Sequence, residues 1–198
     1  GPLPAHGRVR RATLALVALL WAAGCAAPPP APSPTPRAPA MEEPPGLISL
    51  VYLLSAPRRL SEGELTEAVQ RAYRRAPDLL LHLDPTSTVE LGGFRLQVHC
   101  FDRPYVDNPA GVAESIADPS VREPFAGHQA WLSVDVAGHP PGSSATEDYR
   151  RAAPLLAELA GPDVLLLLHP ETNAMLPYDA SLQRSLRAPD PLAALKIP

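Results

Sequence analysis

A proline-rich stretch, residues 26–46, sets the strongest limit on what this chain can fold into. Proline lacks a backbone N–H and has a fixed φ, so it blocks helix interiors and sheet ladders. We expect an extended, polyproline-like tether that rises about 3 Å per residue. The tether is predicted to act as a spacer, and a docking motif for a proline-binding partner is the alternative. All regular structure should therefore lie in a single α+β domain, residues 47–198.

The segment before the tether, residues 1–25, has the pattern of an export signal. Three arginines near its start precede an apolar run, residues 12–23, which leads into Gly24 and Cys25. A basic patch, a short apolar run and small residues are typical of a secretory signal. The small residues before Cys25 resemble the bacterial lipobox, in which the cysteine is lipidated, although Ala22 stands where leucine is usual. We therefore predict a lipoprotein-type signal peptide with Cys25 as the lipidation site.

Two other interpretations of this N-terminal segment stay open. One is a plain signal peptide cut after a small residue, with Cys25 incidental, and the other is an uncleaved anchor. The residue two positions after Cys25 is Ala27 rather than aspartate, which in Gram-negative lipoproteins resembles cargo for the outer membrane. The expected location is the bacterial cell envelope, at the periplasmic face of the outer membrane.

The charge balance limits the partners of the mature protein. Loss of the three arginines in the signal leaves 14 of the 17 basic residues against 21 acidic ones, a net charge of −7. An acidic chain gives no bulk electrostatic support to nucleic-acid binding. It is also not attracted to anionic lipid. The predicted membrane partner is therefore reached through lipid on Cys25, and no nucleic-acid partner is expected.

The segment 127–137 shows the period-two pattern of a strand. One side carries Leu132, Val134 and Val136, and the other carries Trp131, Ser133 and Asp135. Alternation of this kind is typical of a strand with one apolar face and one mixed face. We expect this strand to open the second half of the domain.

Both halves of the domain, about 47–105 and 128–180, follow the order strand, helix, strand, strand. A nearly continuous apolar run at 47–54 predicts a central buried strand. Ser61 and Glu64 predict a capping box at the start of the first long helix. The pattern predicts one mostly antiparallel sheet with the helices packed on one face. This order resembles the paired modules of the gyrase-inhibitor-like fold.

Three segments in fixed order carry a family resemblance. They are the strands 48–54 and 128–135 and, after a helix, the segment 163–172. Together they look like the uncharacterised bacterial domain-of-unknown-function family 4261, or a near neighbour of it, over residues 47–195. The resemblance implies no known activity and no catalytic residues. The lipobox and the tether look like additions to the family pattern.

The residues that could carry chemistry are few. Cys100 falls on an apolar strand face, which favours a buried small side chain over a nucleophile. No histidines have metal-ligand spacing, so neither a metal nor another cofactor is predicted. The chain has no nucleophile elbow and no phosphate-binding glycine loop. A site drawn from separate strands stays open, and it would use His99, Asp102, His169 and Glu171.

A group in the opening strand of the second half is the candidate ligand-binding site. Its members are His128, Trp131, Ser133 and Asp135. Tryptophan offers a large amphipathic surface for recognition. The alternative is that Trp131 packs under a helix and Asp135 caps a loop. We therefore predict an envelope-anchored domain that binds a partner protein or a small ligand. The second hypothesis is a hydrolase-like enzyme with a site assembled between the two halves.

Overall fold

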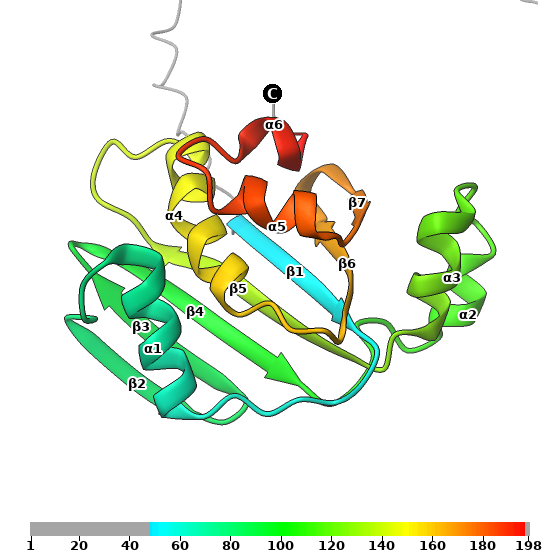
Figure 1. The fold of residues 1–198 in the computed structure, drawn as a ribbon, viewed down its shortest axis with the longest axis horizontal. Coiled ribbons are helices and arrows are strands. Elements are labelled where there is room, and N and C mark those ends of the chain that lie inside the picture. The colour runs from blue at the N-terminus through cyan, green and yellow to red at the C-terminus, as the bar shows by residue number, and fades with distance from the viewer. Residues whose placement is uncertain (1–47, 197–198) are drawn as a thin grey trace, which may run out of the picture. The chain divides into compact units, whose positions relative to one another are not determined.

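A seven-stranded antiparallel sheet organises residues 48–196, the part of the chain that the computed structural model describes. The strands are β1 (Ile48–Leu54), β2 (Leu79–Leu83), β3 (Thr86–Leu91), β4 (Phe94–Phe101), β5 (Ala130–Gly138), β6 (Val164–His169) and β7 (Ala174–Pro177). Their spatial order is β2-β3-β4-β5-β1-β6-β7, and each neighbouring pair is antiparallel (Figure 1). The predicted α+β class is confirmed. The predicted signal, Cys25 and the tether lie outside the described residues.

The two long helices begin at serine caps. At α1 (Glu62–Tyr73), the Ser61 side chain accepts a bond from the Glu64 N–H, and the Glu64 carboxylate accepts one from the Ser61 N–H. The predicted capping box is therefore confirmed. At α4 (Ala145–Glu158), the Ser144 side chain accepts from the Glu147 N–H, and the helix continues through Pro154. The serine caps thus fix where both helices start.

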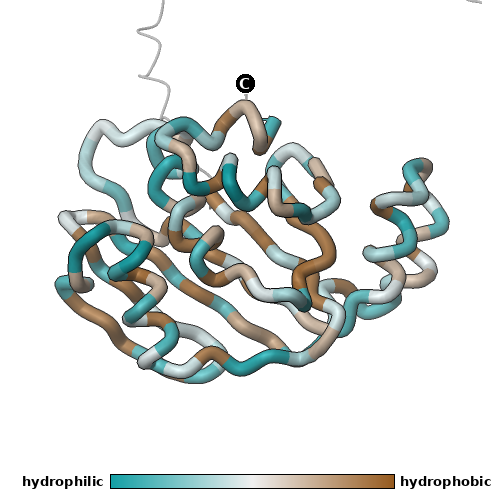
Figure 2. Tube along the Cα trace, in the orientation of Figure 1, coloured by the Kyte–Doolittle hydropathy of each residue, from teal (hydrophilic) through white to brown (hydrophobic). Residues whose placement is uncertain are grey.

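The two faces of the sheet are covered by different helices. On one face, α1 and α4 with α5 (Ala180–Leu186) and α6 (Leu192–Leu195) enclose the main core, to which β1 contributes Leu50, Tyr52 and Leu54. On the other face, α2 (Pro109–Ala113) and α3 (Pro119–Gly127) pack against Val51 and Leu53. The two long helices, α1 and α4, therefore pack on one face as predicted, whereas the shorter helices α2 and α3 pack on the other face, which was not predicted. The physical reason is that β1 and β6 are apolar on both sides and need cover on both (Figure 2).

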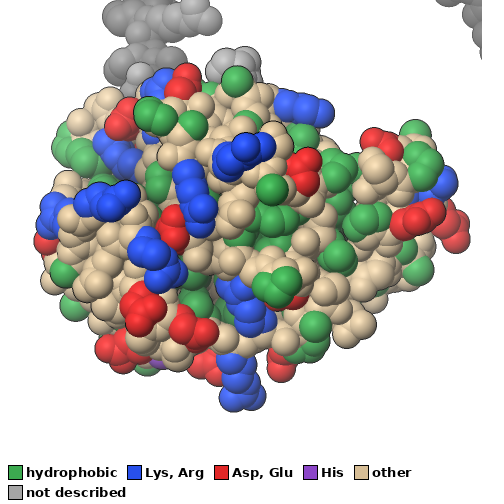
Figure 3. Space-filling view, viewed as in Figure 1, with side chains coloured by type: hydrophobic (Ala, Val, Ile, Leu, Met, Phe, Trp, Pro, Cys, Tyr) green, Lys and Arg blue, Asp and Glu red, His purple; other side chains and the backbone are tan. Residues whose placement is uncertain are grey.

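Among the helices of residues 48–196, α2 and α3 lie on the rear face, and they cover only part of it. Helix α3 contacts β6 and β7, toward one end of the strand order. The rear sides of β2, β3, β4 and β5, which we call the open face, extend beyond it (Figure 1). On the opposite, helix-covered side, acidic and basic side chains are mixed over the helices (Figure 3), and Arg71 and Arg187 both pair with Glu158. The open face is therefore where a functional site on the sheet would be accessible.

The two halves of the domain interlock. The opening strand β1 pairs with β5 on one side and with β6 on the other, so it lies among strands of the second half. After α1, the first half supplies three strands, β2, β3 and β4, and the last of these pairs with β5.

Within residues 48–196, no helix is both long enough and apolar enough to cross a membrane.

Candidate functional site

Four side chains at one end of β4 and β5 form a layered group on the open face, which we call the aromatic cluster. Phe101 and Trp131 are cross-strand neighbours, with ring centroids 4.6 Å apart and 24° between the planes. Tyr105 meets Trp131 edge-on at 5.4 Å, and the Arg103 guanidinium carbon lies 5.2 Å from the Phe101 ring centroid. The three rings are half-buried and Arg103 is exposed. The cluster therefore presents aromatic surface and a cation to solvent.

A chain of polar contacts crosses the sheet beside this cluster, and we call it the polar chain. Asp135 accepts a hydrogen bond from the Ser49 hydroxyl at 2.6 Å, and its other oxygen lies 3.1 Å from His99 Nε2. His99 Nδ1 lies 2.9 Å from the Thr86 hydroxyl oxygen. If Nε2–H donates to the carboxylate, neutral His99 accepts at Nδ1 from Thr86. The polar chain thus joins β3, β4, β5 and β1 through one side chain each.

Strand register explains why these residues meet. Ser133 is opposite His99 of β4 and Val51 of β1, and Asp135 is opposite Ser49. Paired residues in antiparallel strands point to the same face, and so do residues two apart. The predicted alternation therefore places Trp131, Ser133 and Asp135 together on the open face.

Ser133 is the one member of the predicted group with an unmet bonding need. Its side chain is buried, and its hydroxyl has no hydrogen-bond partner within the described part of the chain. A buried hydroxyl without a partner lowers stability.

Nearby, burial raises the pKa of Tyr105, and the charge of Asp135 raises it further. The tyrosine and the carboxylate are therefore close enough to interact, which links the aromatic cluster to the polar chain.

His128 does not join the other predicted residues. It follows α3, before the strand begins at Ala130, and it is only 3% exposed. Its Nε2 accepts from the Tyr105 N–H at 2.9 Å, and its Nδ1 bonds to the Phe125 carbonyl. Burial lowers the pKa of His128, so the ring is held neutral. His128 therefore positions the Tyr105 loop rather than facing a ligand, because it precedes the alternating part of the segment.

Both interpretations of Trp131 hold in part. The ring packs against the smaller apolar cluster formed with α2 and α3, and it stays partly exposed on the open face. Asp135 does not cap a loop, because its two oxygens contact Ser49 and His99. The predicted group thus supplies three residues to the site: Trp131, Ser133 and Asp135.

Sequence reasoning missed several members of the site. Ser49, Thr86, Phe101, Arg103 and Tyr105 were not singled out. The available signal was the alternation 94–101, which sets the side chains of Arg95, Gln97 and His99 on one face. The pairing register that places this row beside β5 depends on contacts far apart in sequence.

The open alternative of a site built from His99, Asp102, His169 and Glu171 is not assembled. His99 contacts Asp135 on the open face, whereas His169 lies on the helix-covered side, where its Nε2 bonds to the Tyr149 hydroxyl. That hydroxyl donates to Glu171 at 2.5 Å and ties α4 to the turn after β6. Among the described residues, no group of acidic, histidine or cysteine side chains is arranged to hold a metal ion.

Cys100 is buried, as predicted. Its thiol donates to the Arg58 carbonyl at 3.2 Å, and burial raises its pKa. A thiol that keeps its proton is a poor nucleophile. Cys100 is therefore a packing residue.

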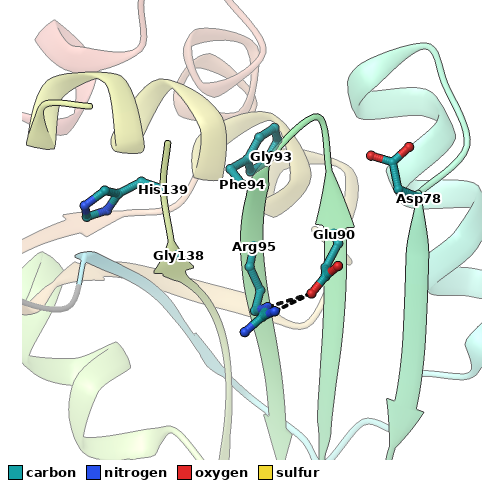
Figure 4. Close-up of a pocket in the computed structure, with 7 residues that line it drawn as sticks. All are labelled: Asp78, Glu90, Gly93, Phe94, Arg95, Gly138 and His139. Carbon is teal, nitrogen blue, oxygen red and sulfur yellow. Dashed lines mark hydrogen bonds and ion pairs between the residues drawn. The ribbon is translucent and has the colours of Figure 1, made fainter. Parts of the chain in front are cut away.

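A hollow of about 320 Å³ lies at the opposite ends of β4 and β5 from the aromatic cluster (Figure 4). It is lined by Asp78, Glu90, Gly93, Phe94, Arg95, Gly138 and His139. Its charged groups are already paired: Arg95 with Glu90, Asp78 with Arg75, and His139 with Asp148 of α4. These contacts stabilise strand ends and a loop, so the aromatic cluster and the polar chain remain the candidate site.

No family model, curated protein or solved structure matches this chain. The resemblance to family 4261 stays a prediction.

Proposed function

We propose that this protein is an envelope lipoprotein whose folded domain binds a partner protein through the open face, with the aromatic cluster as the anchor. The observation that carries the proposal is the half-buried stack of Phe101 and Trp131 beneath Arg103. Tryptophan, tyrosine and arginine are the residue types enriched at the energetic centres of protein interfaces. An aromatic stack held in place by strand pairing also loses little conformational freedom on binding.

The shape of the site favours a protein over a small ligand. Small molecules bind in concave pockets that bury most of their surface. The aromatic cluster lies on the surface of a sheet, and the hollow of Figure 4 is lined by a different set of residues. A partner protein could cover the cluster and exclude water from it. The polar chain would then form the hydrogen-bonding border that gives register and specificity.

A hydrolase-like enzyme is the second candidate, and one observation favours it. Thr86, His99 and Asp135 have the order of nucleophile, base and orienting carboxylate, within hydrogen-bonding distance. They come from strands of both halves. Acyl transfer also requires donors aimed at the developing oxyanion. Strand pairing engages the backbone around Thr86 and His99 in the ladder, so binding is the better-supported function.

The two candidates differ in a simple assay. Hydrolysis of p-nitrophenyl acetate by the wild type, abolished in Thr86→Ala and in His99→Gln, would support the enzyme. Equal rates in all three proteins would leave the polar chain as a binding element.

The binding proposal is tested by site-directed cross-linking. Arg103→Cys and, as a matched control, Val112→Cys are labelled with a benzophenone in a Cys25→Ser background and mixed with envelope extract. Both positions are exposed, but Val112 lies on α2. We expect a discrete adduct at position 103 only, followed by identification and purification of the partner. With that partner, Arg103→Glu should weaken binding at least about 10-fold. Equal labelling at both positions would overturn the proposal.

The proposed anchor rests on the N-terminal sequence pattern and has its own test. Membrane fractionation compares the wild type with Cys25→Ser. We expect the variant to move to the soluble fraction, because the acidic chain would have no other affinity for anionic lipid. Unchanged membrane association of the variant would refute lipidation at Cys25.

A further inference from the structure

The outermost strand β2 presents a row of exposed leucines. Leu79, Leu81 and Leu83 are 48%, 49% and 61% exposed, and they alternate along the strand, so all three lie on the open face. Val112 on α2 is the other large apolar side chain exposed to this degree in the described part of the chain. Sheet edges with exposed apolar residues are sites where another strand pairs.

The two edges of the sheet differ. Strand β7, at the other end, has four residues and includes Pro177, which cannot donate to a ladder. Strand β2 contains neither proline, glycine nor a charged residue, and its flanking residues are Asp78 and Asp84. A short strand and an edge proline are common protections against pairing. The β2 edge lacks both a proline and a charge within the strand.

We propose that two copies of this chain join through their β2 strands as an antiparallel pair, about a two-fold axis at Leu81. The leucine row is symmetric about Leu81. This register therefore sets Leu81 opposite the partner's Leu81, and Leu79 opposite the partner's Leu83. Apolar cross-strand pairs stabilise a sheet, and a two-fold contact uses the same surface on both copies. The two sheets become continuous, and the six leucines shield one another.

Charge at the strand ends affects the strength of this pair. Asp78 comes to lie near the partner's Asp84, and two like charges so placed would weaken the pair. Arg75 forms an ion pair with Asp78, and the Gly92 N–H donates to the same carboxylate at 2.7 Å. Arg75 is half exposed, so its guanidinium can neutralise both carboxylates at each end of the interface. Arg75 is thus expected to control dimer strength without contacting the leucines.

The test is sedimentation velocity of the full chain, in a Cys25→Ser background, at protein concentrations up to about 100 µM. We expect a dimer that Leu81→Lys weakens about 100-fold, because two lysines would face each other across the axis. Circular dichroism checks that Leu81→Lys is folded. If it is not, Leu83→Lys replaces it in the experiment, because Leu83 is the most exposed of the three leucines, and we expect it to weaken the dimer in the same way. The matched control Val112→Lys, at an exposed apolar residue away from β2, leaves the dimer intact.

A covalent test fixes the register. Under mild oxidation, Leu81→Cys forms a disulfide-linked dimer, whereas Val112→Cys does not. The native Cys100 does not interfere because it is buried and its thiol keeps its proton. A monomeric wild type at the highest concentration, dissociation by Val112→Lys, or no cross-link at position 81 overturns the proposal. Arg103→Glu, which is expected to weaken binding of the partner protein, leaves the dimer unchanged. Failure of the dimer proposal can therefore be distinguished from failure of the partner-binding proposal.

Discussion

Replacing Trp131 by alanine separates the recognition surface from the core. Its neighbour Leu132 offers a matched control, because it is fully buried and points to the opposite face of the same strand. Both variants remove one large side chain from β5. They differ in whether the side chain belongs to the main core or to the open face.

The expected losses follow from burial. Removing a fully buried leucine costs about 2–5 kcal/mol of unfolding free energy, and we expect about 3 kcal/mol for Leu132→Ala. A fully buried tryptophan would cost about 3–5 kcal/mol, but Trp131 is partly exposed. The Trp131→Ala variant loses the stack with Phe101, the edge contact with Tyr105 and part of the smaller apolar cluster. Aromatic pairs contribute about 0.5–1.5 kcal/mol each, so we expect a loss of about 2 kcal/mol.

Urea unfolding, monitored by circular dichroism, measures both losses of stability. Binding of each folded variant to the partner protein identified by cross-linking is then measured. We expect Trp131→Ala to lose binding with the smaller loss of stability, and Leu132→Ala to keep binding with the larger one. If Trp131→Ala is destabilised as much as Leu132→Ala, or binds the partner normally, the ring is a core residue and the aromatic cluster is not an anchor.

Three further predictions concern stability. Ser133→Ala should raise the unfolding free energy by about 1 kcal/mol in urea unfolding, because it removes a buried hydroxyl without a partner, and a loss would show that the hydroxyl is bonded. Ser61→Ala should cost about 1 kcal/mol by removing the cap of α1, and an unchanged urea midpoint would contradict the capping box. Burial lowers the pKa of both His128 and His169 in the folded state. As pH falls below about 6.5 the unfolded chain therefore takes up protons first, and stability should decrease from pH 7 to pH 5; a flat urea-midpoint profile would contradict two buried neutral rings.

Local patterns in the sequence predicted the local parts of the fold. The alternation from Trp131 to Val136 predicted both the strand and its two faces. Ser61 with Glu64 predicted the start of α1, since a capping box needs only residues three apart. The apolar run at 47–54 predicted a central strand, and its lack of alternation was also the signal that both of its faces would be covered.

These local patterns could not predict how strands far apart in the sequence pair with one another. His99 and Asp135 are far apart in the chain, and only the pairing of β4 with β5 brings them together. His128 was grouped with Asp135 because it is near in sequence, although it belongs to the end of α3. The side on which α2 and α3 pack likewise depends on which strands end up beside β1. Such pairings are global properties, because one shifted register would exchange the two faces of a strand.

The position of β1 has a consequence for biogenesis. This strand is the first of the seven to be made, yet the ladders on both of its sides come from β5 and β6, which follow much later in the sequence. A nascent polypeptide cannot satisfy the backbone of residues 48–54 until most of the domain has left the ribosome. Folding dominated by such distant contacts is slow and leaves apolar segments unpaired meanwhile. If the protein is exported as proposed, this slow folding would leave the chain unfolded while it passes through a secretion channel.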